Sequence, residues 1–320
     1  MNNKNKINSS AYGGDNWKPR SATHQEEIGS LWSNCGVNSE WAPLKRVLLH
    51  CPGEEFDLQR DPDSVQMLDS IDSKNAIDQH NALVNAYLDE GVIIDFVDPK
   101  GTPSLNQIFC ADLFFMTPEG AILARPASKI RAGEEIWVAR RFADLGIPIL
   151  KTLHGNAVFE GADALWINSN RVLLGRGLRT NDEAISQIST LLHEMHIKVI
   201  PVDLPIGTMH LMGILRFLAK DLVLVWPYRL AWKAINELKA AGFQILLIPD
   251  EKEATNRGSL NFVTLGPRRI IMAEGNTITK SFLESNCVEC KTVNIDELLK
   301  AAGGIGCLTG IVERELEFDG

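Results

Sequence analysis

The sequence predicts an α/β fold in which five similar units close into a ring, like the blades of a propeller. A strand–turn–strand–helix–strand pattern recurs after Pro43 with a spacing of roughly 45 residues. The turns between paired strands carry Pro, Gly, Asn or charged residues, as hairpins require. A strand left over at the C-terminus can complete the first unit and close the ring, which removes exposed sheet edges. An ordinary mixed α/β sheet is the alternative.

The units follow one another along the chain. The first uninterrupted unit has strands at 108–116 and 120–125, a helix at 134–145 and a strand at 148–150. The next has strands at 164–168 and 171–175, a helix at 182–195 and a strand at 198–202. Its helix shows apolar residues three and four positions apart, at Ile185, Ile188, Leu191 and Leu192, which is typical of an amphipathic helix.

Two further units and a composite unit complete the ring. One has strands at 209–217 and 222–226, a helix at 231–241 and a strand at 244–248. The other has strands at 260–265 and 269–273, a helix at 278–285 and a strand at 289–293. The composite unit joins both ends of the chain, with a strand at 45–51, a helix at 73–90, a strand at 92–97 and the C-terminal segment 307–316. These runs are apolar and bounded by turn residues, which is typical of strands.

Composition limits the class of protein. Residues 1–28 are polar and rich in Asn, Ser and Gly, so we expect a flexible N-terminal extension before a single catalytic domain over residues 29–320. The formal net charge of -9 argues against nucleic acid or an anionic membrane as a partner. No apolar run reaches the roughly 18 to 20 residues that span a bilayer, and the first residues lack a signal-peptide core. We therefore expect a cytoplasmic protein.

Six cysteines in a long chain without a secretory signal indicate reduced thiols. Cys287 and Cys290 have the spacing of half a zinc site, but no second pair of ligands follows, so two packed cysteines explain them better. Gly175 and Gly177 lie between a strand and a helix, without the third glycine of a dinucleotide fingerprint. The sequence therefore predicts no metal and no organic cofactor.

Reactive side chains recur at one place in successive units, at or just before the first strand. They are Asp112, Glu160 with Asp163, His210 and Cys307. Equivalent positions in a pseudo-symmetric ring face the same axis, so we expect a thiol, an imidazole and carboxylates to share one pocket. Taken singly, a buried cysteine usually packs and a buried histidine is often a satisfied core residue. A carboxylate in an apolar strand, however, costs several kcal/mol unless a cation pairs with it.

Five segments carry a resemblance to a known group of proteins. They are FCADLFFM, FEGADAL, GRGLRTN, MHLMG and GGIGCLTG. In order and spacing they resemble the guanidino-group modifying superfamily, which contains dimethylarginine dimethylaminohydrolases, arginine deiminases, arginine dihydrolases and amidinotransferases. The resemblance runs from about residue 41 to residue 316. It implies the pentein fold, a five-bladed α/β propeller of ββαβ units, in agreement with the repeat pattern.

The resemblance also implies a role for each matching residue. Cys307 resembles the nucleophile that forms a covalent thiouronium intermediate, and His210 resembles the acid/base that protonates the leaving amine and then activates water. Glu160 resembles the carboxylate that orients the histidine. The residues expected to bind substrate are Asp112, which would pair with the guanidinium, Asp163 in the same turn as Glu160, and Arg131 and Arg179 near the substrate carboxylate. Such chemistry suits a resonance-stabilised planar cation.

Two positions depart from the superfamily pattern. Met212 stands where arginine deiminases carry an aspartate two residues after the histidine, and Ala111 stands where the family has a glutamate before the first aspartate. These departures leave the substrate open, and the resemblance implies a cysteine-dependent hydrolase acting on arginine, an N-substituted arginine or another guanidino compound. An amidinotransferase and a non-catalytic ligand-binding protein are the alternatives. The expected partner is a small guanidino molecule. Many members of the superfamily are dimers or larger, so the resemblance is compatible with a homo-oligomer, although the sequence specifies no oligomeric state.

Overall fold

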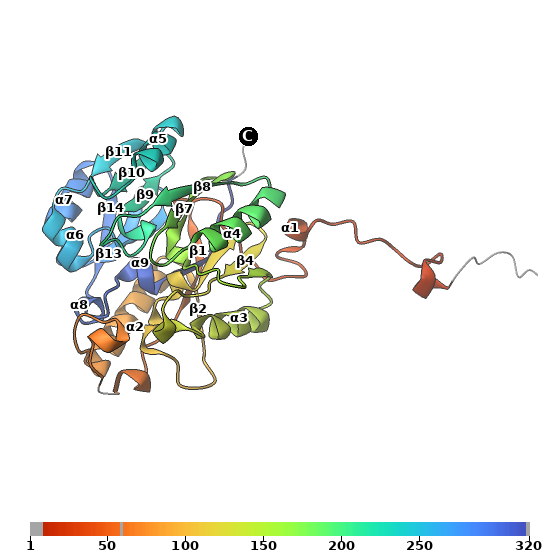
Figure 1. Cartoon of the computed structure of the whole chain (residues 1–320), viewed down its shortest axis with the longest axis horizontal. Coiled ribbons are helices and arrows are strands. Elements are labelled where there is room, and N and C mark those ends of the chain that lie inside the picture. The colour runs from red at the N-terminus through yellow and green to blue at the C-terminus, as the bar shows by residue number, and fades with distance from the viewer. Residues whose placement is uncertain (1–8, 58–59, 318–320) are drawn as a thin grey trace, which may run out of the picture.

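The computed structural model describes residues 9–57 and 60–317, which form five small sheets around a common axis (Figure 1). Each sheet has three strands, ordered β15-β1-β2, β3-β4-β5, β6-β7-β8, β11-β10-β9 and β12-β13-β14. In every sheet the middle strand is antiparallel to one neighbour and parallel to the other. The predicted five-bladed α/β propeller of ββαβ units is confirmed.

The strands fall into three equivalent sets. The first strands are β3 (Phe114–Thr117), β6 (Ala164–Asn168), β9 (Leu215–Ala219), β12 (Val263–Gly266) and β15 (Gly310–Arg314). The middle strands are β1 (Leu44–Leu49), β4 (Gly120–Leu123), β7 (Arg171–Arg176), β10 (Leu222–Val225) and β13 (Arg269–Ala273). The third strands are β2 (Ile93–Phe96), β5 (Ile149–Thr152), β8 (Lys198–Asp203), β11 (Gln244–Leu247) and β14 (Glu289–Val293).

Burial separates the inner strands from the outer ones. All residues of β3, β9 and β12 are buried, whereas β8 and β11 mix buried and exposed residues. A strand covered on both faces is a nearly continuous apolar run, and a strand with one wet face alternates. The first strands therefore line the axis of the ring, and the third strands lie toward the outside.

One helix in each unit connects the middle strand to the third strand and packs on the outside of the ring (Figure 1). These helices are α2 (Ser73–Asp89), α3 (Glu134–Leu145), α4 (Asp182–Glu194), α5 (Trp232–Ala240) and α7 (Thr277–Ser285). Helix α4 begins after Asn181, whose side chain accepts a hydrogen bond from the backbone N–H of Ala184 and caps the helix. It buries Ile185, Ile188 and Leu192 of the predicted stripe, whereas Leu191 is half-buried.

Shorter helical segments connect the units. The α-helical ones are α1 (His24–Glu27), α6 (Glu251–Arg257), α8 (Asp296–Leu299) and α9 (Ile305–Leu308). The 3-10 turns are η1 (Ser10–Tyr12), η2 (Glu54–Asp57), η3 (Asp63–Val65), η4 (Leu105–Ile108), η5 (Cys110–Asp112), η6 (Lys129–Arg131), η7 (Gly161–Asp163) and η8 (Leu211–Gly213). The sequence did not predict α6, α8 or the turns, because so few residues establish no apolar period.

Four predicted strands begin too early: 260–265 begins before β12, and the other three include the helical turn that precedes the strand. The predicted strand 108–116 is η5 followed by β3, the strand 209–217 is η8 followed by β9, and the strand 307–316 is α9 followed by β15. In each of these three cases a short apolar stretch runs through a helical turn into the strand, and an unbroken apolar run hides the change of conformation. These corrections matter because the turns carry the reactive side chains.

The ring is closed by the C-terminal segment, as predicted. Strand β15 pairs antiparallel with β1, with Ile311 opposite Val47 and Gly310 opposite Leu48. The N-terminal segment joins the same region, because the N–H of Gly36 donates to the carbonyl of Val312 at 2.9 Å. The first and last parts of the chain are thus held together at the closing blade.

Residues 9–23 run away from the propeller body (Figure 1). The first eight residues of the predicted extension 1–28 lie outside the described residues. Further along, the N–H of Ser33 donates to the carbonyl of Gly146 at 2.9 Å, which attaches this segment to the end of α3. No helix within residues 9–57 and 60–317 is long and apolar enough to cross a membrane.

Candidate active site

Four short helical turns, each placed directly before a first strand, bring the predicted residues together. Asp112 ends η5, Asp163 ends η7, His210 precedes η8 and Cys307 lies in α9. Because the first strands line the axis, the turns that precede them meet at one end of the ring. The residues come from separate units, so the cluster exists only when the ring is closed.

His210 and Glu160 form the shortest contact of the cluster. Nε2 of His210 lies 2.7 Å from Oε2 of Glu160, and Nδ1 lies 3.7 Å from Oδ1 of Asp112. All three side chains are buried, and Oδ1 of Asp112 forms no hydrogen bond to any residue that the structure describes. An imidazole buried between two carboxylates is strongly favoured in its protonated form.

The opposite charges of His210 and Glu160 stabilise each other. Burial alone would lower the pKa of His210, but Asp112 and the hydrogen bond to Glu160 outweigh it and raise the pKa to about 9. Burial would likewise raise the pKa of Glu160, yet the hydrogen bond and charge of His210, with Arg131 and Arg179, lower it to about 2. At neutral pH the resting pair is therefore imidazolium and carboxylate, so His210 is ready to donate a proton.

Cys307 is held by a residue that the sequence analysis missed. Nδ2 of Asn261 donates to the sulfur at 2.9 Å, and Oδ1 of Asn261 accepts from the backbone N–H of Cys307 at 3.0 Å. Burial and the negative charge of Asp112 raise the pKa of the thiol to about 11, while Asn261 and the charge of Arg216 act in the opposite direction. Without a bound cation, the thiol is therefore protonated at neutral pH.

Asn261 occupies the fifth equivalent position of the ring. It lies two residues before β12, as the other site residues lie at or near the starts of their first strands. The segment SLNFVTL contains no ionisable side chain, so its residue types indicate no reactive group. The signal that could have identified Asn261 was the repeat register alone.

Both predicted arginines bind internal carboxylates in this structure. Arg131 donates from NH1 to Asp112 at 2.7 Å and to Glu160 at 3.2 Å, and from Nε and NH2 to Glu134 at 2.9 and 2.8 Å. Arg179 donates from NH1 to both oxygens of Glu160, at 3.1 and 3.2 Å. The guanidinium of Arg131 thus lies against Asp112, the carboxylate expected to hold a substrate guanidinium.

Glu134 is a second residue that the sequence analysis missed. It is the first residue of α3 and lies three positions after Arg131, a spacing at which side chains meet in helical structure. Its carboxylate is buried against Arg131, and the hydroxyl of Ser104 donates to its other oxygen. Glu134 therefore fixes Arg131 from the side opposite Asp112.

Asp163 lies behind the cluster. Its Oδ2 accepts from the hydroxyl of Thr180 at 2.6 Å, and its Oδ1 accepts from the backbone N–H of Leu211 at 3.0 Å. It is fully buried, and burial raises its pKa to about 6. Both oxygens are thus committed to protein groups, one of them in the turn that follows His210, so the geometry suits a positioning role better than direct substrate contact.

Two pockets meet at Cys307. The smaller, of about 20 Å³, is lined by residues that include Asp112, Arg131 and Arg179. The larger, of about 420 Å³, includes His210, Asn261 and Arg229, and the two share Met209, Ala302, Gly303 and Cys307. Gly303 is required for this junction, since a Cβ there would lie 2.3 Å from the ring of Phe109. A ligand at the junction would reach the sulfur, the imidazole and the carboxylate.

The same cluster offers three ligand atoms to a cation. Among the described residues, Asp112, Glu160 and His210 form the one group of His, Cys, Asp and Glu side chains whose donor atoms lie within 4.8 Å of one another. Two of these three residues bind the guanidinium of Arg131, which already supplies a positive charge. The donor set therefore suits a planar organic cation that can form several N–H···O bonds at once.

The closed ring of five ββαβ units, with a buried thiol, imidazole and carboxylates at its axis, defines the guanidino-group modifying (pentein) superfamily of enzymes, as the sequence motifs predicted. A family model for N,N dimethylarginine dimethylhydrolase, eukaryotic, matches residues 60–313. The chain therefore belongs to the dimethylarginine dimethylhydrolase family.

Similar sequences occur in bacteria. The N(G),N(G)-dimethylarginine dimethylaminohydrolase of Mycobacterium tuberculosis is 27% identical over 240 residues, which cover 75% of this chain and 76% of that protein. The uncharacterized protein YkgA of Bacillus subtilis is 26% identical over 275 residues, which cover 85% of this chain and 92% of that protein.

Two solved structures share the fold. DDAH from Pseudomonas aeruginosa, complexed with citrulline, superposes with a TM-score of 0.70 at 22% identity, covering 83% of this chain and 98% of that one. The amidinotransferase SxtG from Microseira wollei superposes with a TM-score of 0.70 at 16% identity, covering 89% of this chain and 99% of that one. At these identities the likeness concerns the fold.

Proposed function

We propose that this chain is a cysteine-dependent hydrolase that acts on the guanidinium carbon of arginine or an N-substituted arginine. The observation that carries the proposal is the position of Cys307 at the junction of two pockets, one lined by Asp112 and the other by His210. Membership of the dimethylarginine dimethylhydrolase family supports the same reaction class. Asp112 would hold the substrate guanidinium through Oδ1, the oxygen that forms no hydrogen bond within the described part of the chain.

In the first step, the substrate cation activates its own nucleophile. A guanidinium beside Cys307 offsets the burial and the Asp112 charge that raise the pKa of this thiol, so the thiol releases its proton to solvent and the thiolate forms. The sulfur lone pair forms a bond to the guanidinium carbon, and one C–N bond then breaks. His210, protonated at rest, gives its proton to the departing amine, and a thiouronium remains on Cys307.

In the second step, the neutral His210 takes a proton from water, and the resulting hydroxide adds to the thiouronium carbon. Collapse of this adduct breaks the carbon–sulfur bond, and the hydroxyl proton of the adduct passes to the departing sulfur, which returns the thiol of Cys307. The products are a ureido compound and an amine or ammonia. Glu160, whose Oε2 lies 2.7 Å from Nε2 of His210, holds the imidazole in both steps. Asp163 accepts a hydrogen bond from the backbone N–H of Leu211, the residue that follows His210.

The proposal is tested by trapping the intermediate. Full-length protein is mixed with arginine, N-methylarginines and simpler guanidines and quenched, and peptides are examined by mass spectrometry. We expect a mass increase on Cys307 and on none of the other five cysteines, together with formation of a ureido product. Cys307→Ser should abolish turnover and leave the circular dichroism spectrum unchanged, whereas Cys290→Ser, a buried control, should retain activity. Full activity of the Cys307 variant would remove the mechanism.

An amidinotransferase is the second candidate, favoured by the size of the larger pocket. Its volume of about 420 Å³ adjoins both Cys307 and His210 and exceeds the room that a water needs, so an acceptor amine could replace water in the second step. The solved amidinotransferase with the same fold is consistent with this candidate.

The two candidates are separated by the fate of the amidino group. Labelled arginine is incubated with the protein, with and without glycine or other small amines. The hydrolase proposal expects a labelled ureido product without added amine. Turnover that depends on an amine, with the label transferred to it and no citrulline formed, would favour the amidinotransferase. Slow labelling of all six thiols by iodoacetamide, without dependence on pH, would favour a non-catalytic ligand-binding protein.

A further inference from the structure

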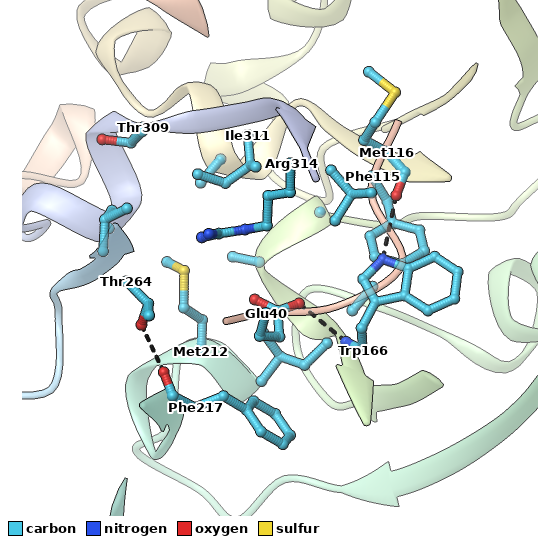
Figure 2. Close-up of a pocket in the computed structure, with 18 of the residues that line it drawn as sticks. Glu40, Phe115, Met116, Trp166, Met212, Phe217, Thr264, Thr309, Ile311 and Arg314 are labelled. Carbon is cyan, nitrogen blue, oxygen red and sulfur yellow. Dashed lines mark hydrogen bonds between the residues drawn. The ribbon is translucent and has the colours of Figure 1, made fainter. Parts of the chain in front are cut away.

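A separate cavity of about 70 Å³ lies on the propeller axis, and Figure 2 shows side chains that line it. Its walls come from the first strands of all five units. Ala111, Gly161, Met212 and Gly306 also line it, and each lies within two residues of a side chain of the candidate active site. The same turns thus carry reactive groups on one side and border the axial cavity on the other.

Two arginines from different units line this cavity. Arg216 belongs to β9 and is 8% exposed, and its guanidinium makes no hydrogen bond to any described residue; it lies 5.3 Å from the ring centre of Phe262. Arg314 ends β15 and is 3% exposed. Its Nη1 donates to the carbonyl of Ala42 at 2.6 Å, but its buried Nε forms no hydrogen bond to the described residues. Most of their donors are therefore free to bind a ligand.

One carboxyl group also lines the cavity, and it does not neutralise both arginines. Oε1 of Glu40 accepts from the backbone N–H of Trp166 at 3.0 Å (Figure 2), and no ion pair within the described part of the chain joins Glu40 to Arg216 or Arg314. Burial raises the pKa of Glu40, while the charges of Arg314 and Arg216 act in the opposite direction. The cavity therefore holds an excess of positive charge.

We propose that the axial cavity binds a small oxyanion, of the carboxylate or inorganic phosphate type, between the guanidinium groups of Arg216 and Arg314. A guanidinium is planar and matches two oxygens of such an anion at once. A buried donor without a partner costs about 1 to 3 kcal/mol, and an anion would satisfy several donors together. A cavity needs roughly 10 to 15 Å³ to hold a water, so this one has room for a small oxyanion but not for a nucleotide.

The site is tested by isothermal titration calorimetry of the full chain with sodium phosphate and, separately, sodium acetate, at constant ionic strength. Saturable binding of one anion per chain is expected, and the stronger of the two ligands identifies the preferred oxyanion. Arg216→Met and Arg314→Met should each weaken binding by about tenfold or more, since each removes a charge-assisted contact. The matched control is Arg268→Met, because Arg268 pairs with Asp221 outside the cavity and should leave affinity unchanged.

A variant that is expected to bind the anion more tightly completes the test, because misfolding could not produce tighter binding. Glu40→Gln removes the cavity's carboxyl charge and keeps an oxygen that can accept from Trp166, so it should tighten binding by roughly threefold to tenfold. Absence of saturable heat for either anion with the unmodified chain would overturn the proposal. So would equal affinity of the Glu40→Gln variant and the unmodified chain, or an equal loss in the Arg268→Met control.

Discussion

The amide of Asn261 holds Cys307 from two directions, and this contact offers a sharp test at the residue scale. Nδ2 donates to the sulfur and Oδ1 accepts from the backbone N–H. We expect Asn261→Asp to keep the acceptor while replacing the donor with a negative charge, which raises the pKa of the thiol. Labelling of Cys307 by iodoacetamide at about pH 8 should slow by about tenfold or more, because one pKa unit changes the thiolate fraction tenfold.

The control for this variant is Asn256→Asp. Asn256 lines the same larger pocket and is exposed on α6, so it receives the same charge without contacting the sulfur. Labelling of Cys307 should change little in this variant. Equal slowing in both variants would mean that the general charge of the pocket, and not the hydrogen bond of Asn261, controls the thiol.

At this scale, the sequence predicted the residues that carry a charge or a reactive group. Asp112, Glu160 and His210 stood out as polar side chains in apolar segments, and the structure brings them into contact. Asn261 and Glu134 were missed because an amide in a turn and an acid at the start of a helix are common features. The internal pairing of Arg131 with Asp112 could not be predicted, since side-chain direction in a turn depends on its tertiary contacts.

At the scale of elements, the turns before the first strands are packed backbone to backbone. A Cβ at Gly161 in η7 would lie 2.1 Å from the carbonyl oxygen of Phe114 and 2.5 Å from that of Ala111, so η7 can approach η5 only with glycine there. We expect Gly161→Ala to lower the free energy of unfolding by about 1 to 3 kcal/mol, as overpacking does, measured by chemical denaturation.

Gly213 in η8 is the matched control, because a Cβ there meets no atom within 4 Å and its backbone needs no left-handed conformation. Gly213→Ala should change stability by less than about 0.5 kcal/mol. If both variants were equally destabilised, the approach of η7 to η5 would not be what requires glycine. A larger loss of activity than of stability for Gly161→Ala would indicate that the approach also positions Glu160.

The longer elements could be predicted, and the turns could not. Helix α3 and strand β6 have the bounds that their apolar spacing predicted, because each has enough residues to establish a period. Turns of three residues, such as η5 and η8, have none. Their apolar neighbours were read as the beginnings of strands, and this error moved the reactive residues from turns onto strands.

At the scale of the whole molecule, the active-site cluster links folding to pH because its members come from different units. The repeat count predicted the ring and its closure by β15, but not the second cavity on the axis, which depends on side chains from five strands meeting at one place. His210 and Glu160 pair only in the closed ring. Because folding shifts their pKa values, the free energy of unfolding of the entire fold must depend on pH.

The sign of each contribution follows from its shift. The pKa of Glu160 falls from 4.5 to about 2 on folding, so its contribution is complete above pH 4.5 and is lost as the pH falls toward 2. The pKa of His210 rises from 6.5 to about 9, so its contribution is complete below pH 6.5 and is lost as the pH rises through 9. Both contributions are complete between about pH 4.5 and 6.5.

We therefore expect the stability difference between the unmodified chain and Glu160→Gln to be largest in this window and to shrink on both sides. Urea unfolding at a series of pH values measures the difference, and Glu183→Gln, which changes an exposed acid on α4, should show no such maximum. A difference that stayed constant from pH 3 to 9 would mean that Glu160 stabilises the fold by packing alone. In that event the imidazolium–carboxylate pair would not exist at rest, and His210 would need another source for the proton that it delivers.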